Sequence, residues 1–198
     1  MFAESISNEE ITQLPLLQFT GRTVIINTPN DLTDDVLAEL SGASVLGFDT
    51  ETRPVFKAGP RNSTALLQLS THDLAVLVRL NTAGLPVPIV SLLESPDVLK
   101  IGAAVHDDIK GLQRIVRFKA HGFVDLQAIV PRFGIAVKGL RKMAAVVLGG
   151  RVSKAQQLSN WEAETYTPAQ ISYAATDAWV GLLMYKRLQA ENPQYVRP

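Results

Sequence analysis

The sequence has no cysteine, few charged residues and no long apolar run. The lack of cysteine among 198 residues excludes disulfide bonds and thiolate metal sites. Charged residues make up only 19% of the chain and the formal net charge is zero, which argues against long disorder and against a surface that coats nucleic acid indiscriminately. No run reaches the length of a membrane span, and the first residues lack the order of a signal peptide. These absences predict a soluble, cytoplasmic protein.

The remaining composition is that of one globular domain. The chain is 46% hydrophobic over 198 residues, enough for one sizeable core. Residues 1–22 form a lead-in, where Ser7 and Glu10 have the spacing of a capping box and predict one or two helical turns. We predict a single domain over residues 1–198, with its core at residues 40–190.

Apolar and β-branched runs bounded by turn residues predict the strands, and capping signals predict the helices. The pair at residues 65–70 and 74–80 reads as a hairpin that continues an antiparallel meander, and strands alternate with helices after it. The sequence therefore predicts an α/β fold with a mixed sheet and helices on its faces. The expected strands are 23–26, 45–49, 65–70, 74–80, 100–105 and 123–124, and the expected helices are 33–40, 86–93, 107–117, 125–130, 139–148 and 167–190.

Two carboxylates stand at the end of the expected strand 45–49. Residues two apart in an extended chain point to the same side, so Asp49 and Glu51 would lie together. At ~4 Å and an effective dielectric constant near 20, two such charges repel by roughly 4 kcal/mol, so the pair must take up a proton, meet a cation or bind a metal. The alternative is that both are solvated turn residues, hydrogen-bonded by Thr50 and Arg53.

The last expected helix carries Tyr173 and Asp177, which are four residues apart and therefore on one face. An acid on the closely packed side of a helix is unfavourable unless it is partnered, which favours a functional Asp177. The alternative is an exposed aspartate beside a core tyrosine. The small neighbours that would allow a close approach to the sheet are Ala174, Ala175, Ala178 and Gly181.

Five segments together resemble a known family. They are GFDTETRP at 47–54, ALLQLST at 65–71, KIGAAVHDD at 100–108, SNW at 159–161 and YAATDA at 173–178. Their order and spacing resemble the DEDDy 3′-to-5′ exonucleases, in particular ribonuclease D and the exonuclease domain of the Werner syndrome helicase, over residues 40–190. The predicted mixed sheet is compatible with the ribonuclease H-like fold of this family.

The resemblance implies a role for five residues. Two divalent ions, Mg²⁺ or Mn²⁺, would be held by Asp49, Glu51, Asp108 and Asp177. Tyr173 would orient the attacking water, since a phenol with a pKa near 10 is a poor general base. Asp107 is the rival of Asp108 and is expected to be an N-cap instead.

The implied function is metal-dependent 3′-to-5′ hydrolysis that releases nucleoside 5′-monophosphates from a free 3′ end of single-stranded DNA or RNA. Phe48 or Leu67 would contact sugar and base, and an end of the chain at Pro198, without a helical nucleic-acid-binding domain, would limit processivity. An alternative is a nucleic-acid-binding or scaffold protein that has lost catalysis on the same fold. A purely structural α/β domain would require three spaced coincidences.

Other residues carry weaker signals. Trp161 would either stack on a base or pack under the irregular loop that precedes residue 165, and His72, His106 and His121 lack the spacing of metal ligands. The pair Gly149-Gly150 reads as a helix stop. Candidates for backbone phosphate contacts, or else ordinary surface cations, are Lys57, Arg61, Lys138, Arg141, Lys142, Arg151 and Lys154.

Overall fold

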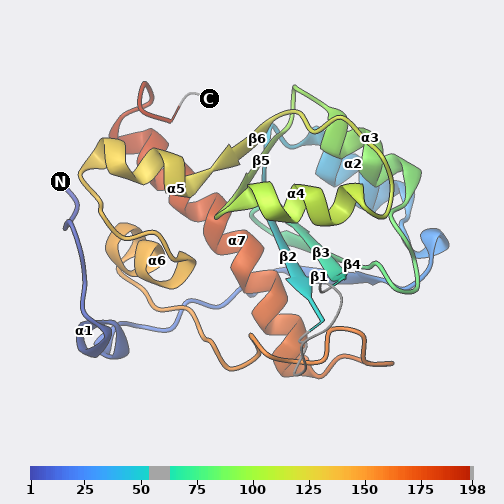
Figure 1. The fold of residues 1–198 in the computed structure, drawn as a ribbon, viewed down its shortest axis with the longest axis horizontal. Helices are drawn as coiled ribbons and strands as arrows, with labels where there is room; N and C mark the ends of the chain where they lie inside the picture. The colour runs from blue at the N-terminus through green and yellow to red at the C-terminus, as the bar shows by residue number, and fades with distance from the viewer. Residues whose placement is uncertain (54–62, 197–198) are drawn as a thin grey trace.

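The computed structural model describes residues 1–53 and 63–196, which fold around a six-stranded mixed sheet (Figure 1). The strand order is β1-β4-β3-β2-β5-β6. Within the described part of the chain, no helix is both long and apolar enough to cross a bilayer. The strands are β1 Arg22–Ile26, β2 Val45–Thr52, β3 Thr64–Ser70, β4 Leu74–Arg79, β5 Leu99–Gly102 and β6 Phe123–Asp125.

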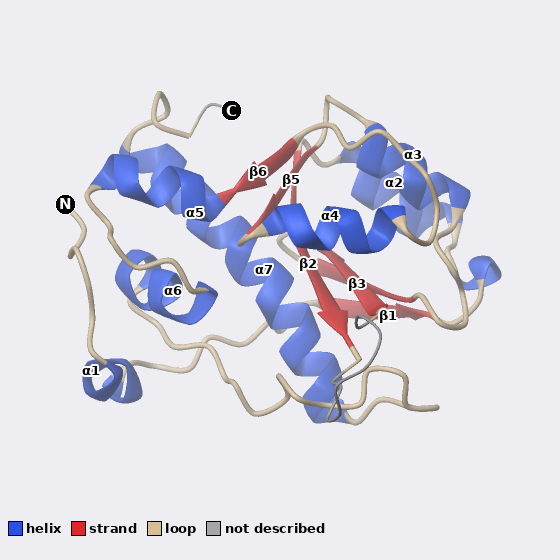
Figure 2. Cartoon of the chain, viewed as in Figure 1, coloured by secondary structure: helices blue, strands red, loops and turns tan. Residues whose placement is uncertain are grey.

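The helices largely follow the predicted pattern (Figure 2). The capping box at Ser7 is confirmed, as is the second box in which Thr167 accepts from Gln170 at the start of the longest helix. The α-helices are α1 Asn8–Gln13, α2 Asp34–Gly42, α3 Val87–Glu94, α4 Val105–Gln113, α5 Leu126–Ile129, α6 Leu140–Leu148 and α7 Pro168–Glu191, and the 3-10 helices are η1 Pro29–Asp31 and η2 Val130–Phe133.

The sheet topology confirms the predicted combination of meander and crossovers. Strands β2, β3 and β4 pair antiparallel in succession. β1 is parallel to β4, β5 is parallel to β2, and β6 is parallel to β5. Parallel pairs require crossover connections, and the helices α2, α3 and α4 lie in the connections between these strands.

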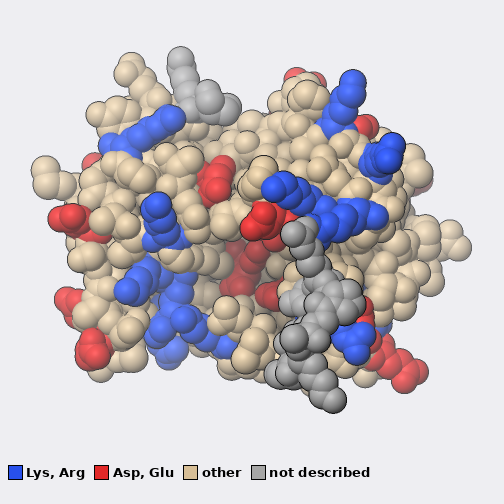
Figure 3. Space-filling view, in the orientation of Figure 1, with Lys and Arg blue, Asp and Glu red and all other residues tan. Residues whose placement is uncertain are grey.

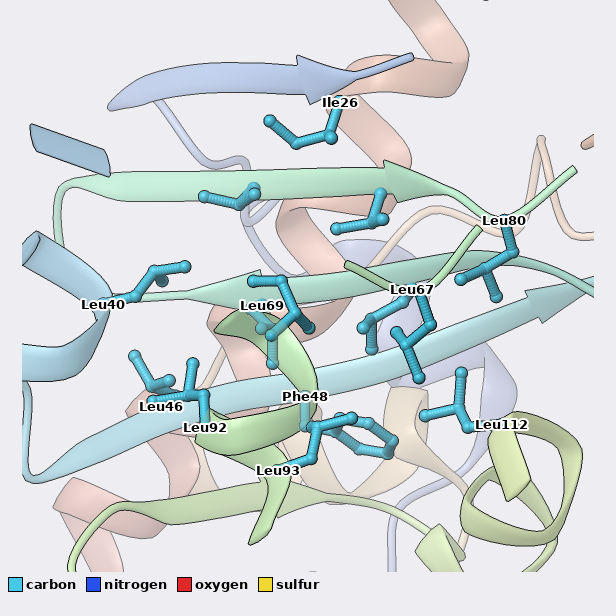
Figure 4. Close-up of a cluster of buried hydrophobic side chains, with 14 of the residues drawn as sticks. Ile26, Leu40, Leu46, Phe48, Leu67, Leu69, Leu80, Leu92, Leu93 and Leu112 are labelled. Carbon is cyan, nitrogen blue, oxygen red and sulfur yellow. The ribbon is translucent and has the colours of Figure 1, made fainter. Parts of the chain in front are cut away.

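One face of the sheet packs against α2, α3 and α4. Buried side chains from the strands, such as Phe48 and Leu67, meet Leu40 of α2, Leu93 of α3 and Leu112 of α4 in one cluster (Figure 4). The strand residues in this cluster, such as Phe48 and Leu67, face away from α7, so the residues that alternate with them along each strand face α7.

The other face is crossed diagonally by α7 (Figure 1). The approach is close at Gly47, where an added Cβ would lie 1.9 Å from the carbonyl oxygen of Ala178. Ala174 and Ala178 are fully buried there. The small residues of α7 therefore do let the helix lie against the sheet, as predicted.

Two predicted boundaries are wrong. β2 continues to Thr52, so Asp49 and Glu51 lie within a strand and not in a solvated turn. The expected strand 100–105 ends at Gly102, because Ala104 adopts a left-handed conformation with φ 62° and serves as the N-cap position of α4. Asp107 is therefore in the first turn of α4 and is not its N-cap.

Lys100 ties β5 to the end of α3. Its ammonium is fully buried and donates to the carbonyl oxygens of Leu92, Ser95 and Val98 at 3.1, 2.7 and 2.7 Å. Burial lowers the pKa of Lys100 to about 8, so the group remains charged at neutral pH and the three bonds are charge-assisted.

We expect Lys100→Met to lower the free energy of unfolding by about 3 kcal/mol, because it leaves buried carbonyl groups without a donor. Urea denaturation followed by circular dichroism measures the change. A loss below about 1 kcal/mol would show that the carbonyl groups find other partners.

Candidate active site

The two acids of β2 face α7. In the antiparallel pair with β3, Gly47 lies opposite Ser70 and Asp49 opposite Gln68, and Gly47 packs directly against α7. Since side chains alternate along a strand, Asp49 and Glu51 share the α7 side, while Thr50 points to the α4 side. The prediction that the two carboxylates lie on one side follows from this register.

Tyr173 and Asp177 come from the face of α7 that meets these acids. Asp177 is only 5% exposed, and its Oδ1 has no hydrogen-bond partner among the described residues. The ring of Tyr173 lies beside the fully buried Trp161, with centroids 5.9 Å apart. The arrangement contradicts the alternative of an exposed aspartate.

Asp49, Glu51, Tyr173 and Asp177 line one hollow with a volume of about 460 Å³. Figure 3 shows acidic side chains in the middle of this face, with lysine and arginine side chains gathered over α6 and over α4 on either side. The remaining wall comes from α1, β2, the N-terminal end of α6 and the loop after α6, through Asn8, Thr50, Gly139, Leu140, Arg141, Lys142, Val152, Ser153, Lys154 and Gln157.

Burial and neighbouring acids disfavour the charged form of the carboxylates in this hollow and raise their pKa values. Burial raises the pKa of Asp49 well above its usual range, and repulsion from Asp177 and Glu51 raises it further. Burial, with repulsion from Asp177 and Asp108, raises the pKa of Glu51 to about 8. Burial raises the pKa of Asp177 to about 7, and the Tyr173 hydroxyl partly offsets this rise. A cation placed between these groups would reverse their pKa shifts.

Asp108 approaches from the opposite face of the sheet. Its Oδ1 accepts a hydrogen bond of 2.5 Å from the Oγ1 of Thr50, the residue between the two acids of β2. Burial raises the pKa of Asp108, and the Thr50 hydroxyl opposes the rise. Thr50 thus connects Asp108 to the end of β2, a link that the spacing of the motifs did not reveal.

The donor set fits a hard divalent cation by its chemistry. Carboxylate oxygens are the preferred ligands of Mg²⁺ and Mn²⁺, and a buried Asp177 oxygen is left unpartnered. No described lysine, arginine or histidine lies within 4.0 Å of the carboxylate oxygens of Asp49, Glu51 or Asp177. The described side chains nevertheless form no group of three or more that already converges as a metal site.

The structure separates the predicted basic residues. Arg141, Lys142 and Lys154 line the acidic hollow. Arg151 instead donates from Nε to the carbonyl oxygen of Leu14 and anchors the lead-in, and Lys138 does not line this hollow. Lys57 and Arg61 lie outside the described residues. Lys110 and Arg114 were not predicted. They line a second hollow beside Thr50 and Asp108, and their only signal is a spacing of four residues at the C-terminal end of α4.

Burial overturns one predicted substrate contact and decides between the two alternatives for Trp161. Phe48 is 1% exposed and Leu67 is fully buried, so neither can contact a sugar or base. Trp161 is also fully buried against Tyr166 and Tyr173, so it packs under the loop and does not stack on a base. His72, His106 and His121 are exposed.

Comparison with known proteins identifies relatives of this arrangement. A family model described as "3'-5' exonuclease" matches residues 24–192. Exonuclease 3'-5' domain-containing protein 2 of Drosophila melanogaster is 36% identical over 84% of the chain, and the bifunctional 3'-5' exonuclease/ATP-dependent helicase WRN of Mus musculus is 31% identical over 88%. Ribonuclease D of Gluconacetobacter diazotrophicus is 31% identical over 85%. The chain spans 30%, 13% and 44% of these three relatives.

Solved structures share the fold. The Nibbler EXO domain of Aedes aegypti superposes with a TM-score of 0.77 at 22% identity, covering 87% of this chain and 89% of that one. RNase D of Escherichia coli gives 0.76 at 21% identity, covering 86% and 45%. RNase D of Trypanosoma brucei in complex with RNA U12 gives 0.74 at 18% identity, covering 90% and 70%. The predicted fold class is thereby confirmed.

Proposed function

Since the chain belongs to the 3′-5′ exonuclease family whose model matches residues 24–192, we propose that it hydrolyses single-stranded nucleic acid from a free 3′ end. The products are nucleoside 5′-monophosphates, released one at a time. The observation that supports this most is the hollow in which Asp49, Glu51 and Asp177 lie beside Tyr173 without a cationic partner among the described residues.

The carboxylates are the groups that would hold two divalent ions. Asp49, Glu51 and Asp177 would contribute from the α7 side of β2, and Asp108 from the α4 side, where Thr50 orients it. Bound there, the ions would stabilise the developing charge on the attacking and leaving oxygens of the phosphodiester.

Tyr173 would position the attacking water. Burial, together with the negative charges of Asp177 and Glu51, raises the pKa of Tyr173 well above its usual range, so the hydroxyl stays protonated. A protonated phenol can donate one hydrogen bond and accept another, which fixes the direction of a water molecule without taking its proton. The role is therefore orientation and not general base catalysis.

Substrate phosphates would meet Arg141, Lys142 and Lys154 on the wall of the hollow. Because the net charge of the chain is zero, the attraction for nucleic acid is local to this wall. Single-stranded RNA and DNA both have this phosphate chemistry, and a relative solved with RNA supports RNA as one substrate.

Linear and circular single strands of the same sequence test this function, as RNA and as DNA, with Mg²⁺, Mn²⁺ or EDTA. We expect only the linear strands to be degraded, and only with metal, because the hollow needs a free 3′ end and a cation. The faster polymer is the preferred substrate. Degradation of circles, or equal rates in EDTA, would refute the proposal, and binding without any cleavage would favour a non-catalytic protein.

A further inference from the structure

Gln68 lies at the centre of the sheet, beside the acidic hollow. It pairs with Asp49 across the antiparallel strands β3 and β2. Side chains of directly opposed residues point to the same side, with Cβ atoms about 5 Å apart. Gly47 and Ser70, the pair two positions along, lie against α7, so Gln68 and Asp49 also face α7. Gln68 is therefore a neighbour of the carboxylates and not part of the core cluster under α2 and α3.

The side-chain amide of Gln68 is buried, and it makes no hydrogen bond with the described residues. It is fully inaccessible to solvent, and neither its Nε2 nor its Oε1 has a hydrogen-bond partner among the described residues. Buried amides are almost always hydrogen-bonded, because an unpaired one destabilises the fold. Leucine or methionine would fill the same space without this penalty. An unpaired amide at this position indicates that Gln68 forms its hydrogen bonds only when cations are bound in the hollow.

The neighbouring carboxylates can accept the hydrogen bonds that the Gln68 amide lacks. Asp177 also has a buried oxygen, Oδ1, without a hydrogen-bond partner. A primary amide has two N–H donors, which matches the two carboxylates of Asp49 and Asp177 on this side of the sheet. Hydrogen bonds to the outer oxygens of metal-ligating carboxylates orient them, and loss of such bonds weakens metal binding about 10- to 100-fold.

We propose that Gln68 is a positioning residue whose Nε2 donates to the carboxylates of Asp49 and Asp177 when divalent cations occupy the site, and so orients these carboxylates. This role rests on the proposed function, since it assumes that these carboxylates bind metal. It adds to that function a residue that does not itself touch metal or substrate.

Calorimetric titration of EDTA-stripped protein with Mn²⁺ tests the role, with Gln68→Met as the variant and Ser70→Ala as the control. Ser70 is buried on the same face with an unpartnered hydroxyl, but it lies opposite Gly47 and not opposite a carboxylate. We expect Gln68→Met to weaken Mn²⁺ binding about 10- to 100-fold and to lower kcat similarly, while its thermal midpoint stays equal or rises. We expect Ser70→Ala to bind Mn²⁺ like the wild type.

The possible outcomes distinguish the role of Gln68 from the metal-dependent function on which it rests. Wild-type affinity in Gln68→Met would refute the role of Gln68 alone, whereas wild-type protein that binds no Mn²⁺ would refute the metal-dependent function as well. A second measurement needs no substitution: in the wild-type protein, the side-chain amide signal of Gln68 should shift in ¹⁵N NMR when Mg²⁺ is added. An unmoved signal would overturn the proposal even if the variant failed to fold.

Discussion

Asp49→Asn is expected to lower the rate of nucleotide release by about a thousandfold or more while leaving the fold intact. The pKa of Asp49 is raised by burial and by repulsion from three other acids of the site, Asp177, Glu51 and Asp108. Loss of about 4 kcal/mol of transition-state stabilisation corresponds to about a thousandfold in rate.

Asparagine keeps the shape of the side chain and one carbonyl oxygen, which can still accept the 2.9 Å hydrogen bond from the backbone N–H of Thr50. It removes one buried charge from a repelling group, so the thermal midpoint without metal should stay equal or rise. Mn²⁺ should raise the midpoint of the wild type and raise that of Asp49→Asn much less.

Asp107→Asn is the matched control for this change. It also removes one negative charge, but Asp107 is exposed and does not line the acidic hollow. We expect nearly wild-type rates from it. Equal losses in both variants would show that the rate depends on total charge and not on the position of Asp49.

Tyr173→Phe is expected to slow the reaction by about 10²- to 10⁴-fold with little effect on metal binding. The substitution deletes only the hydroxyl, and the phenyl ring keeps its contact with Trp161. Because the hydroxyl remains protonated, its loss should lower kcat at all pH values and should not remove an ionisation from the pH profile. Single-turnover rates across pH 6–9 measure this.

Tyr166→Phe is the control for this change, because we expect it to affect stability and not activity. Its hydroxyl donates to the carbonyl oxygen of Trp161 at 2.6 Å, its ring stacks under Arg79, and it does not line the acidic hollow. This variant should lose about 1 kcal/mol of stability and keep its activity. A Tyr173→Phe variant that retained wild-type kcat would refute the orienting role of the hydroxyl.

Local signals in the sequence predicted most of the architecture. The box formed by Thr167 and Gln170 is decided by residues that are neighbours in the chain, and so is the shared side of Asp49 and Glu51. Such features depend on the helical and strand periods alone, which a sequence displays directly. Tyr173 and Asp177 meet the β2 acids because small residues let α7 approach, which composition also indicates.

Tertiary contacts could not be predicted in the same way. The bond from Thr50 to Asp108 joins residues 58 apart in the chain across two elements, and the burial of Gln68 depends on the register of three strands. The start of α4 was misplaced because Ala104 adopts a positive φ that its residue type does not favour. Tertiary packing determines the Thr50–Asp108 bond and the burial of Gln68. These two features distinguish the residues around the hollow from ordinary polar residues.

The position of the first cut shows whether the protein removes nucleotides from the 3′ end or cleaves within the strand. A short single strand labelled at its 5′ end is incubated with the protein and Mn²⁺, and its products are resolved over time. We expect a ladder that shortens by one nucleotide at each step, with nucleoside 5′-monophosphates as the released units. Products of internal cleavage at early times, or no shortening of a strand that the protein demonstrably binds, would contradict it.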